Sequence, residues 1–391
     1  MPAGTKHLVL DLFAGIGGAS YALGEQEHQE HHIFFETDQF CRAVLGERIA
    51  SGNIFGSLSR GQDQSGLSGS VGWLTDDRFR NLKSLVSSPD LASVLVISGS
   101  PCVGFTKIKK GNIGVEDRES VKIWMAVAIV AFLRANTELI IHHLFENVDM
   151  LEHHKAAISS VMGSQPTLIE AGRLCGCRRP RLYWSSLPVE PITGIGIEPT
   201  TCLENGWIPA WELGNSKQDH PRFGTFLRPF EPHRPKECKN VPYPRLPLSS
   251  YTWKGLVVNS AASQHEREEI RCMLTHAASA KGDIQDAASE RFEAHLKIAD
   301  FIHLHGGERV LRPLTPSERE ACLGFPPGAS GSESASPWHR MATLGNTFAV
   351  PVLAHLLRSW RERRAIREPT AGPSLYEENE IIEALRGGNR R

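Results

Sequence analysis

The feature that most constrains the fold is the uncharged run at residues 94–97, which a Gly-Ser-Pro turn ends at residues 99–101. Such a run predicts a short strand buried on both faces of a sheet. Cys102 follows the turn directly. Ligands of open α/β sheets bind beyond the carboxyl ends of the strands, so this thiol is expected at a ligand-binding edge. A cysteine there can act as a nucleophile, although a lone Pro-Cys is more often a small buried residue in a turn.

A second strand-turn-helix pattern stands at the start of the chain. Residues 8–13 predict an apolar strand, and residues 14–18 (AGIGG) predict a glycine-rich turn before a helix. Gly15 and Gly17 let the backbone pass close to a ligand, as a nucleotide-like cofactor requires. Glu36 ends the next predicted strand, roughly 20 residues further on, where a carboxylate accepts hydrogen bonds from ribose hydroxyls. The two signals together favour a nucleoside-bearing cofactor, whereas the glycines alone also fit a tight turn without a ligand.

Further apolar runs complete a predicted sheet of seven strands. These strands are residues 8–13, 33–38, 71–77, 94–97, 139–148, 167–171 and 181–184. The apolar run at residues 123–133 predicts a buried helix, because it is too short to span a bilayer. Strands that alternate with helices predict the α/β class and a mostly parallel sheet.

Charged residues at strand ends form a second group of candidates. Glu146 lies near the carboxyl end of its strand, on the edge that is expected to carry Cys102, although it also fits a cap for the following helix. Arg179 and Arg181 belong to a cluster of three arginines, which marks a solvated face unless anionic groups converge there. Asp76 ends the third predicted strand, where it suits an adenine contact or a helix cap.

The pattern changes after residue 188, where many prolines and glycines indicate a separate, loop-rich domain. Residues 217–245 carry seven Lys or Arg against three acids, a balance of +4, with aromatic residues between them. This mixture suits phosphate contacts and base stacking, although a solvated loop looks much the same. Residues 52–72 predict an inserted surface loop, and the lysines within residues 107–118 suit a loop that contacts phosphate.

Composition limits the kind of site and compartment. Eight cysteines without an export signal predict a reducing compartment and free thiols. Cys175 and Cys177 stand too close for a usual zinc pair, so no metal is expected. No apolar run is long enough for a membrane span. The net charge of −1 neither supports nor excludes nucleic acid.

The order of these motifs resembles the DNA (cytosine-5)-methyltransferase family. The resemblance covers residues 7–187 and 311–360. Because six blocks follow the family order, the probability that the similarity arises by chance is very small. The blocks are residues 11–18 (DLFAGIGG), 100–102 (SPC), 146–148 (ENV), 179–181 (RPR), 314–325 and 345–346. Within the family, residues 145–148, 183–184 and 350–356 are most similar to the eukaryotic de novo branch.

The resemblance implies a Rossmann-like, class I fold dependent on S-adenosyl-L-methionine, with a mostly parallel seven-stranded sheet and a smaller loop-rich target recognition domain. Residues 1–187 and 311–364 would form the catalytic domain, residues 188–310 the target recognition domain, and residues 365–391 a polar C-terminal tail. Duplex DNA would be the partner. The expected location is the nucleus in a eukaryote and the cytoplasm otherwise.

The resemblance also assigns roles to single residues. Cys102 would add to C6 of cytosine, Glu146 would contact N3, and Arg181 with Arg179 would stabilise charge at the carbonyl oxygen. The base must leave the duplex to reach them. The cofactor contacts that the resemblance implies are Asp11, Phe13, Ala14, Gly15, Gly17, Glu36, Asp76, Pro101 and Asn346.

Two positions depart from the family pattern. Cys177 stands where a glutamine usually opens the Arg-x-Arg motif, and Thr106 stands where serine is commoner. Two alternatives stay open. One is an RNA methyltransferase of the same fold, although residues 188–310 lack the Cys-Phe-Thr signature of the branch that modifies transfer RNA. The other is a catalytically silent paralogue that binds DNA or a partner, against which the intact Cys102 and Glu146 argue.

Overall fold

The computed structural model describes residues 6–24, 30–50, 53–55, 86–102, 104–105, 120, 122–193, 196–214, 222–226, 251–252, 254–283, 289–304, 306–332 and 335–363. The described chain forms two compact units. Unit 1 comprises residues 1–170, 180–192 and 352–391, and unit 2 comprises residues 171–179 and 193–351. Residues 311–351, which the sequence analysis groups with the catalytic domain, therefore lie in unit 2. Compactness and function are separate criteria, so the division of functional roles between domains stays a prediction.

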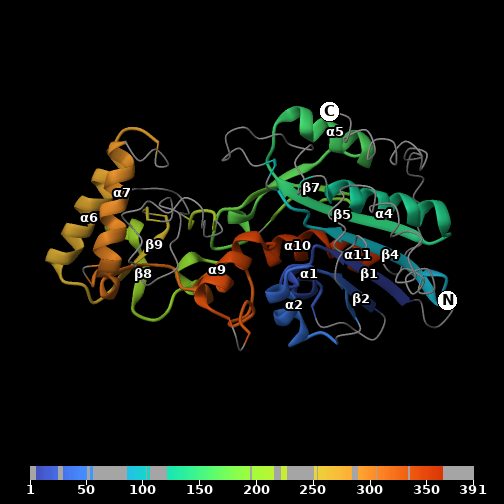
Figure 1. The fold of residues 1–391 in the computed structure, drawn as a ribbon, viewed down its shortest axis with the longest axis horizontal. Coiled ribbons are helices and arrows are strands. Elements are labelled where there is room, and N and C mark those ends of the chain that lie inside the picture. The colour runs from blue at the N-terminus through green and yellow to red at the C-terminus, as the bar shows by residue number, and fades with distance from the viewer. Residues whose placement is uncertain are drawn as a thin grey trace. The chain divides into compact units, whose positions relative to one another are not determined.

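Unit 1 contains a seven-stranded sheet in the described part of the chain (Figure 1). Its strands are β1 (Lys6–Leu12), β2 (Glu30–Phe35), β3 (Ile54–Phe55), β4 (Leu91–Ser98), β5 (Ile140–Val148), β6 (Thr167–Glu170) and β7 (Pro180–Ser185). Their order is β3-β2-β1-β4-β5-β7-β6. Neighbouring strands are parallel except that β7 runs antiparallel to both β5 and β6. The predicted α/β class and the mostly parallel sheet of seven strands are confirmed.

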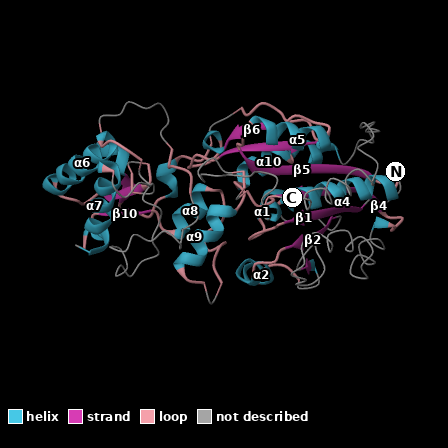
Figure 2. Ribbon diagram, turned by 45° about the horizontal axis from the view of Figure 1, so that its top comes forward, coloured by secondary structure: helices cyan, strands magenta, loops and turns pink. Residues whose placement is uncertain are grey.

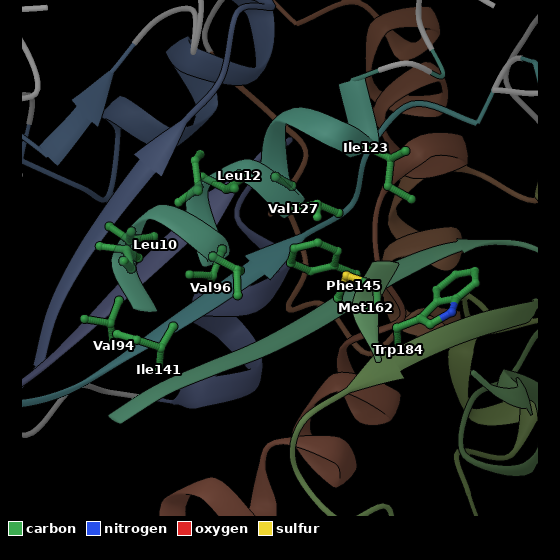
Figure 3. Packing of buried hydrophobic residues seen from close by; sticks show 14 of the residues in the cluster. Leu10, Leu12, Val94, Val96, Ile123, Val127, Ile141, Phe145, Met162 and Trp184 are labelled. Carbon is green, nitrogen blue, oxygen red and sulfur yellow. The ribbon is translucent and has the colours of Figure 1, made fainter. Parts of the chain in front are cut away.

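Apolar residues cover both faces of this sheet, as a parallel sheet requires. On one face α4 (Lys122–Asn136) packs through residues such as Ile123 and Val127 against Leu10, Val96 and Phe145 (Figure 3). The helix is apolar over most of its circumference, which fits its burial. Truncation of a fully buried aromatic side chain in such a core costs about 3–5 kcal/mol.

The opposite face is covered by the C-terminal part of unit 1. Trp360 of α11 (Arg358–Arg363) meets the ring of His7 edge to face, with ring centroids 5.9 Å apart. His7 is buried and its Nδ1 lies 2.7 Å from Ser93 Oγ on the neighbouring strand. The polar ring therefore has a partner inside an otherwise apolar layer.

Unit 2 contains a smaller antiparallel sheet and a helical hairpin (Figure 2). Strands β8 (Trp207–Pro209), β9 (Leu256–Asn259) and β10 (Leu311–Pro313) pair in the order β10-β9-β8. Helices α6 (Gln264–Ser279) and α7 (Glu290–Leu304) share one apolar core with this sheet. The prolines and glycines that predict a loop-rich domain after residue 188 do not reveal this sheet.

The remaining helices are short. In unit 1 they are α1 (Gly18–Leu23), α2 (Gln39–Gly46) and α5 (Glu152–Met162); in unit 2 they are α8 (Pro316–Cys322) and α9 (Pro337–Asn346); α10 (Val350–Leu356) spans the boundary. Single turns of 3-10 helix are η5 (Ala171–Arg173), η6 (Pro199–Cys202), η7 (Ala210–Leu213) and η10 (Gly307–Arg309). Helix α8 begins with a capping box formed by Thr315 and Glu318, and Pro316 is its first helical residue.

Some expectations are corrected or lie elsewhere. Ile54 and Phe55 pair with β2 as strand β3, so this part of residues 52–72 is not the surface loop that the sequence predicts. The loop prediction is wrong there because two residues are too short a run to give a strand pattern. The predicted strand at residues 71–77, the loop at residues 107–118 and the tail at residues 365–391 lie outside the described residues, as do residues 217–245 except 222–226. No helix in the described part of the chain is long and apolar enough to cross a membrane.

Candidate functional site

Cys102 lies just beyond the carboxyl end of β4, where the sequence places it. It is half-buried, and its carbonyl oxygen accepts a hydrogen bond from Phe105 N at 3.0 Å. Gly104 N donates to the buried Ser120 Oγ at 2.8 Å. These hydrogen bonds fix the backbone that follows Cys102, so the thiol lies on a defined turn.

Asn147 ties this turn to the neighbouring strand β5. Its Nδ2 donates to Ser100 O at 3.3 Å and to Ser100 Oγ at 3.2 Å, and the side chain is fully buried. Its Oδ1 accepts from Val148 N at 2.9 Å. The amide thus fixes the Ser-Pro-Cys turn two residues before the thiol. The sequence analysis assigns Asn147 no role, and its place beside Glu146 at a strand end is the signal that could have indicated one.

Glu146 forms an ion pair with Arg181 at the same sheet edge. Arg181 Nε lies 2.8 Å from Glu146 Oε1, and the two side chains are 12% and 11% exposed. The antiparallel pairing of β5 with β7 places Arg181 opposite Val148, two residues from Glu146 along β5. Because β4 and β5 are parallel and Ser98 pairs with Phe145, Glu146 continues β5 beside the start of the Cys102 turn. The thiol, the carboxylate and the guanidinium thus belong to one edge of unit 1.

Arg179 has a different environment from Arg181, although only one residue separates them. Arg179 is only 4% exposed and belongs to unit 2. Its Nη1 donates to Gly345 O at 3.2 Å. It therefore holds the end of α9, where Asn346 is exposed. This contact gives Arg179 a positioning role for the segment that ends at Asn346.

The glycine-rich turn between β1 and α1 has the strained backbone that its sequence predicts. Gly15 and Gly17 have φ values of +56° and +79°, and Phe13 has a φ of +59°. Among the described residues, Phe13 is the one non-glycine residue with positive φ. A Cβ atom at Gly15 would meet no other atom within 4 Å, so its surface is open to a ligand. Ala14 N donates to Phe35 O at 3.0 Å and fastens the turn to β2.

Glu36 organises the same turn. Its Oε2 accepts from Gly15 N at 2.7 Å, and its Oε1 accepts from Thr37 N at 2.7 Å and Asp38 N at 2.8 Å. The side chain is half-buried. A carboxylate has about four acceptor positions, so one stays open for a hydroxyl group. Asp38 caps α2 through Cys41 N at 2.9 Å.

Arg48 supports the turn from behind, a role that sequence reasoning missed. Its guanidinium donates to Ile16 O at 3.1 Å and to Ser20 Oγ at 3.3 Å. It also lies over the ring of Tyr21, 4.0 Å from the centroid. A Cβ atom at Gly17 would stand 2.7 Å from Arg48 Nη2, so only glycine fits there. A lone arginine after a helix carries no sequence signal for such a contact.

Asp11 lies beneath the turn and is fully buried. Its Oδ2 is 3.8 Å from Nε2 of the buried His32 on β2. Burial, and then the nearby Glu36 carboxylate, raise the pKa of Asp11 well above its ordinary value of 3.8. Burial, and then the charge of Arg48, lower the pKa of His32 from 6.5 to about 3. Burial thus favours the neutral form of each side chain, and Asp11 lies near the end of β1, directly before the glycine-rich turn.

Three other expectations concern the edges of this site. Pro101 is half-buried beside Cys102. Asp76 lies outside the described residues. Within the described ranges, no group of three or more His, Cys, Asp or Glu side chains is arranged to hold a metal ion.

Comparison with known proteins supports the same fold. Neither a family model nor a curated protein sequence matches the chain. The fold is similar to that of a mutant DNMT2 from Spodoptera frugiperda, with a TM-score of 0.53 and 16% identity over 90% of this chain and 99% of the other. It is also similar to the methyltransferase EhMeth from Entamoeba histolytica, with a TM-score of 0.52 and 12% identity over 93% and 100% of the two chains.

These similarities extend over nearly the whole length of both chains. The predicted Rossmann-like methyltransferase fold is therefore confirmed. At identities this low the likeness concerns the fold, and the activity has to be argued from the side chains.

Proposed function

We propose that this protein transfers a methyl group from S-adenosyl-L-methionine to C5 of cytosine in DNA, through a covalent bond between Cys102 and C6 of a flipped base. One observation carries the proposal. Cys102 and the Glu146–Arg181 ion pair lie at the ends of the adjacent strands β4 and β5, and Asn147 joins the two segments. A thiol, a carboxyl group and a guanidinium are the groups that this reaction requires.

The residues of the glycine-rich turn fit the proposed cofactor. Gly15 presents an open surface, and the Glu36 carboxylate beside it retains an acceptor position for a ribose hydroxyl. Phe13, Ala14 and Gly17 shape the rest of this turn. When bound, S-adenosyl-L-methionine supplies an electrophilic methyl group. Pro101, Asp76 and Asn346 stay proposed contacts, and Asp11 acts from beneath the turn.

The chemistry follows from the electronic structure of cytosine. C5 is a weak nucleophile until another group adds at C6, and the Cys102 thiolate is proposed to make that bond. Addition moves electron density toward N3, where the Glu146 carboxyl group holds a proton and accepts a hydrogen bond from the exocyclic amine. Arg181, oriented by its contact with Glu146, stabilises negative charge at the carbonyl oxygen. After methylation, loss of the C5 proton allows the thiolate to leave and restores the free cysteine.

The target base has to be extruded from the double helix. Its C5 and C6 atoms are stacked inside a duplex, so a buried sheet edge can reach them only in a flipped nucleotide. Arg179 is assigned to this proposal as a positioning residue, because its guanidinium holds the Gly345 carbonyl.

The decisive experiment compares the full chain with its Cys102→Ser variant. Labelled methyl incorporation is measured with duplex DNA and, in parallel, with transfer RNA. The wild-type protein is expected to label DNA. The methylation rate of Cys102→Ser is expected to be at least about a thousandfold lower. Cys272→Ser, which changes an exposed cysteine on α6, serves as the matched control and should behave as wild type.

A second readout tests the covalent step. DNA with fluorine at C5 of the target cytosine cannot lose that substituent as a proton, so the Cys102 bond should persist and a stable protein–DNA complex should form. Retained methylation by Cys102→Ser would contradict the mechanism. If only transfer RNA were labelled, the proposed substrate would be RNA and not DNA. Cofactor binding without methylation of either nucleic acid would favour a silent binding paralogue.

A further inference from the structure

Four buried cysteines lie within unit 2, and the proposed methyl transfer uses none of them. Cys175 and Cys177 flank Gly176, Cys202 ends the 3-10 helix η6, and Cys322 ends α8. A Cβ atom at Gly176 would stand 3.1 Å from Cys202 Sγ and 3.2 Å from Cys322 Sγ. Two thiols from segments about 120 residues apart in the sequence therefore meet over one glycine.

The two thiols border the same point over Gly176 and are not equivalent. Cys202 and Cys322 share a hydrogen bond, which lowers the pKa of Cys202, with Thr201 and Arg222 acting in the same direction. Burial, and then this same bond, raise the pKa of Cys322 well above its ordinary value of 9.0. Cys202 is 6% exposed and Cys322 is 0% exposed. The more acidic thiol is thus also the more accessible one, which is the arrangement of an attacking and a resolving cysteine.

Polar contacts already hold the two segments together. Glu204, two residues after Cys202, donates its N–H to Glu318 Oε1 at 3.1 Å and accepts from Arg312 Nη2 at 3.2 Å. Arg312 also pairs with Glu318 at 2.7 Å, and Thr315 Oγ1 donates to Glu204 Oε1 at 3.3 Å. These groups anchor the residue pair that follows η6 to the first turn of α8 and the strand before it. These contacts keep the two cysteine-bearing segments together in the reduced protein.

A buried cation lies in the same region. Arg319 is 2% exposed, and its Nε and Nη1 have no hydrogen-bond partner in the described part of the protein. Its guanidinium lies 5.0 Å from the ring centre of Phe226. Burial lowers the pKa of Arg319 to about 10, and nearby Cys322, Tyr251 and Cys177 act against that change. A positive charge next to thiols favours a thiolate over a neutral thiol.

We propose that Cys202 and Cys322 form an oxidisable dithiol that hydrogen peroxide converts into an intramolecular disulfide. The Cys202 thiolate attacks one peroxide oxygen, the O–O bond breaks, and the departing oxygen leaves as water after taking up a proton. Cys202 becomes a sulfenic acid. The Cys322 sulfur then attacks Cys202 Sγ, the sulfenic oxygen leaves as a second water, and the S–S bond forms. Two thiols are oxidised and one peroxide is reduced, so atoms and electrons balance.

The disulfide would fasten η6 to α8 and close a long loop. In chain-entropy terms a cross-link across roughly 100 residues is among the most stabilising, because it restricts the unfolded chain. The reduced and oxidised proteins should therefore differ in thermal stability. This inference is independent of the proposed methyl transfer.

The test oxidises the full native chain with limiting hydrogen peroxide, blocks the remaining thiols, and maps peptides by mass spectrometry with and without reduction. The expected product is a Cys202–Cys322 cross-linked peptide that dithiothreitol cleaves. The melting midpoint should rise by at least roughly 5 °C on oxidation and return on reduction. Cys272→Ser is the matched control and should give the same cross-link as wild type.

Single substitutions separate the two roles. Cys322→Ser, or Cys322→Ala if the serine variant fails to fold, should leave Cys202 as a sulfenic acid that a 1,3-dione probe captures. Cys202→Ser should leave Cys322 as an unmodified thiol. A cross-link that joins Cys322 to Cys177, or oxidation confined to the exposed Cys272, would overturn the proposal.

Discussion

Two pairs of an acidic and a basic side chain lie on neighbouring strands of the same sheet. Glu146 and Arg181, on β5 and β7, are 2.8 Å apart and each is slightly exposed. Asp11 and His32, on β1 and β2, are 3.8 Å apart and are almost completely excluded from solvent. Both pairs join an acid to a base across a strand ladder. They differ in depth and in distance.

The difference teaches how depth assigns chemistry to similar residues. At the sheet edge, the paired carboxyl group and guanidinium keep partial contact with solvent, so both are placed where a substrate can meet them. In the interior, burial raises the pKa of Asp11 and lowers the pKa of His32 to about 3, so it favours the neutral form of each side chain. The edge pair is suited to catalysis, and the interior pair is suited to supporting the turn above it.

The largest expected effect comes from Glu146→Gln, which keeps the shape of the side chain and removes its proton-holding function. We expect kcat for methyl transfer to fall by about a hundredfold or more, with little change in cofactor affinity. Steady-state kinetics with labelled cofactor, and binding of the cofactor by calorimetry, separate the two quantities.

The matched control for Glu146→Gln is Glu152→Gln, an exposed glutamate on α5 that pairs with Lys155 at 2.7 Å. That variant should keep wild-type kinetics. Unchanged kcat in Glu146→Gln would mean that the edge pair is no more reactive than the interior pair, and the comparison would fail.

A smaller effect is expected from Asn147→Ala, because Asn147 holds the Cys102 turn without touching a substrate. Loss of its two contacts with Ser100 should lower kcat roughly tenfold and lower the free energy of unfolding by about 1–3 kcal/mol. Asn147→Asp, which keeps the shape but not the donor, should lower kcat similarly. A stability loss with unchanged kcat would limit Asn147 to a structural role.

The smallest effect concerns the interior pair and the pH dependence of stability. The raised pKa of Asp11 contributes stability below 3.8 that is lost as the pH rises through the folded-state value. The lowered pKa of His32 contributes stability above 6.5 that is lost as the pH falls toward about 3. Between these limits the two trends oppose each other, so the intact pair should give little net slope.

Single substitutions should reveal the two slopes. Asp11→Asn leaves His32, so unfolding free energy should fall as the pH is lowered from 6.5, by at most about 1.4 kcal/mol per pH unit. His32→Gln leaves Asp11 and should give the opposite slope above 3.8. Urea unfolding across this interval measures both. His143, whose pKa burial also lowers to about 3, is common to all three proteins and cancels in the comparison. Equal slopes in the two variants would contradict a neutral interior pair.

The sequence predicts six of the seven strands of the large sheet, because each is an apolar run ended by a turn. Strand β3 is two residues long and pairs only with β2, so it has no periodic signal. The sheet of unit 2 is missed for a related reason, since strands of three or four residues pair across about 50 residues between β8 or β10 and β9. Long-range pairing of short strands leaves almost no local pattern.

The site divides in the same way between local and long-range information. The positions of Cys102 and Glu146 at strand ends follow from local pattern alone. The ion pair with Arg181 depends on the reversed direction of β7, and the support of the glycine turn by Arg48 depends on a fold-level contact. The contrast between Arg179 and Arg181 has the same origin, because the two arginines of one motif belong to different units and have partners there. The order of motifs therefore identifies the candidate side chains, whereas the contacts of each side chain are known only from the tertiary structure.

The reversed strand β7 has a consequence for how this sheet edge tolerates change. In a purely parallel sheet, every residue at the carboxyl edge would end its strand and precede a loop. Insertions in that loop would displace the residue. Because β7 runs antiparallel to β5, Arg181 lies at the beginning of β7. Its backbone pairs with Val148 of β5 and so holds the side chain at this edge. The connection that precedes β7 can therefore vary in length while Arg181 keeps its position relative to Glu146.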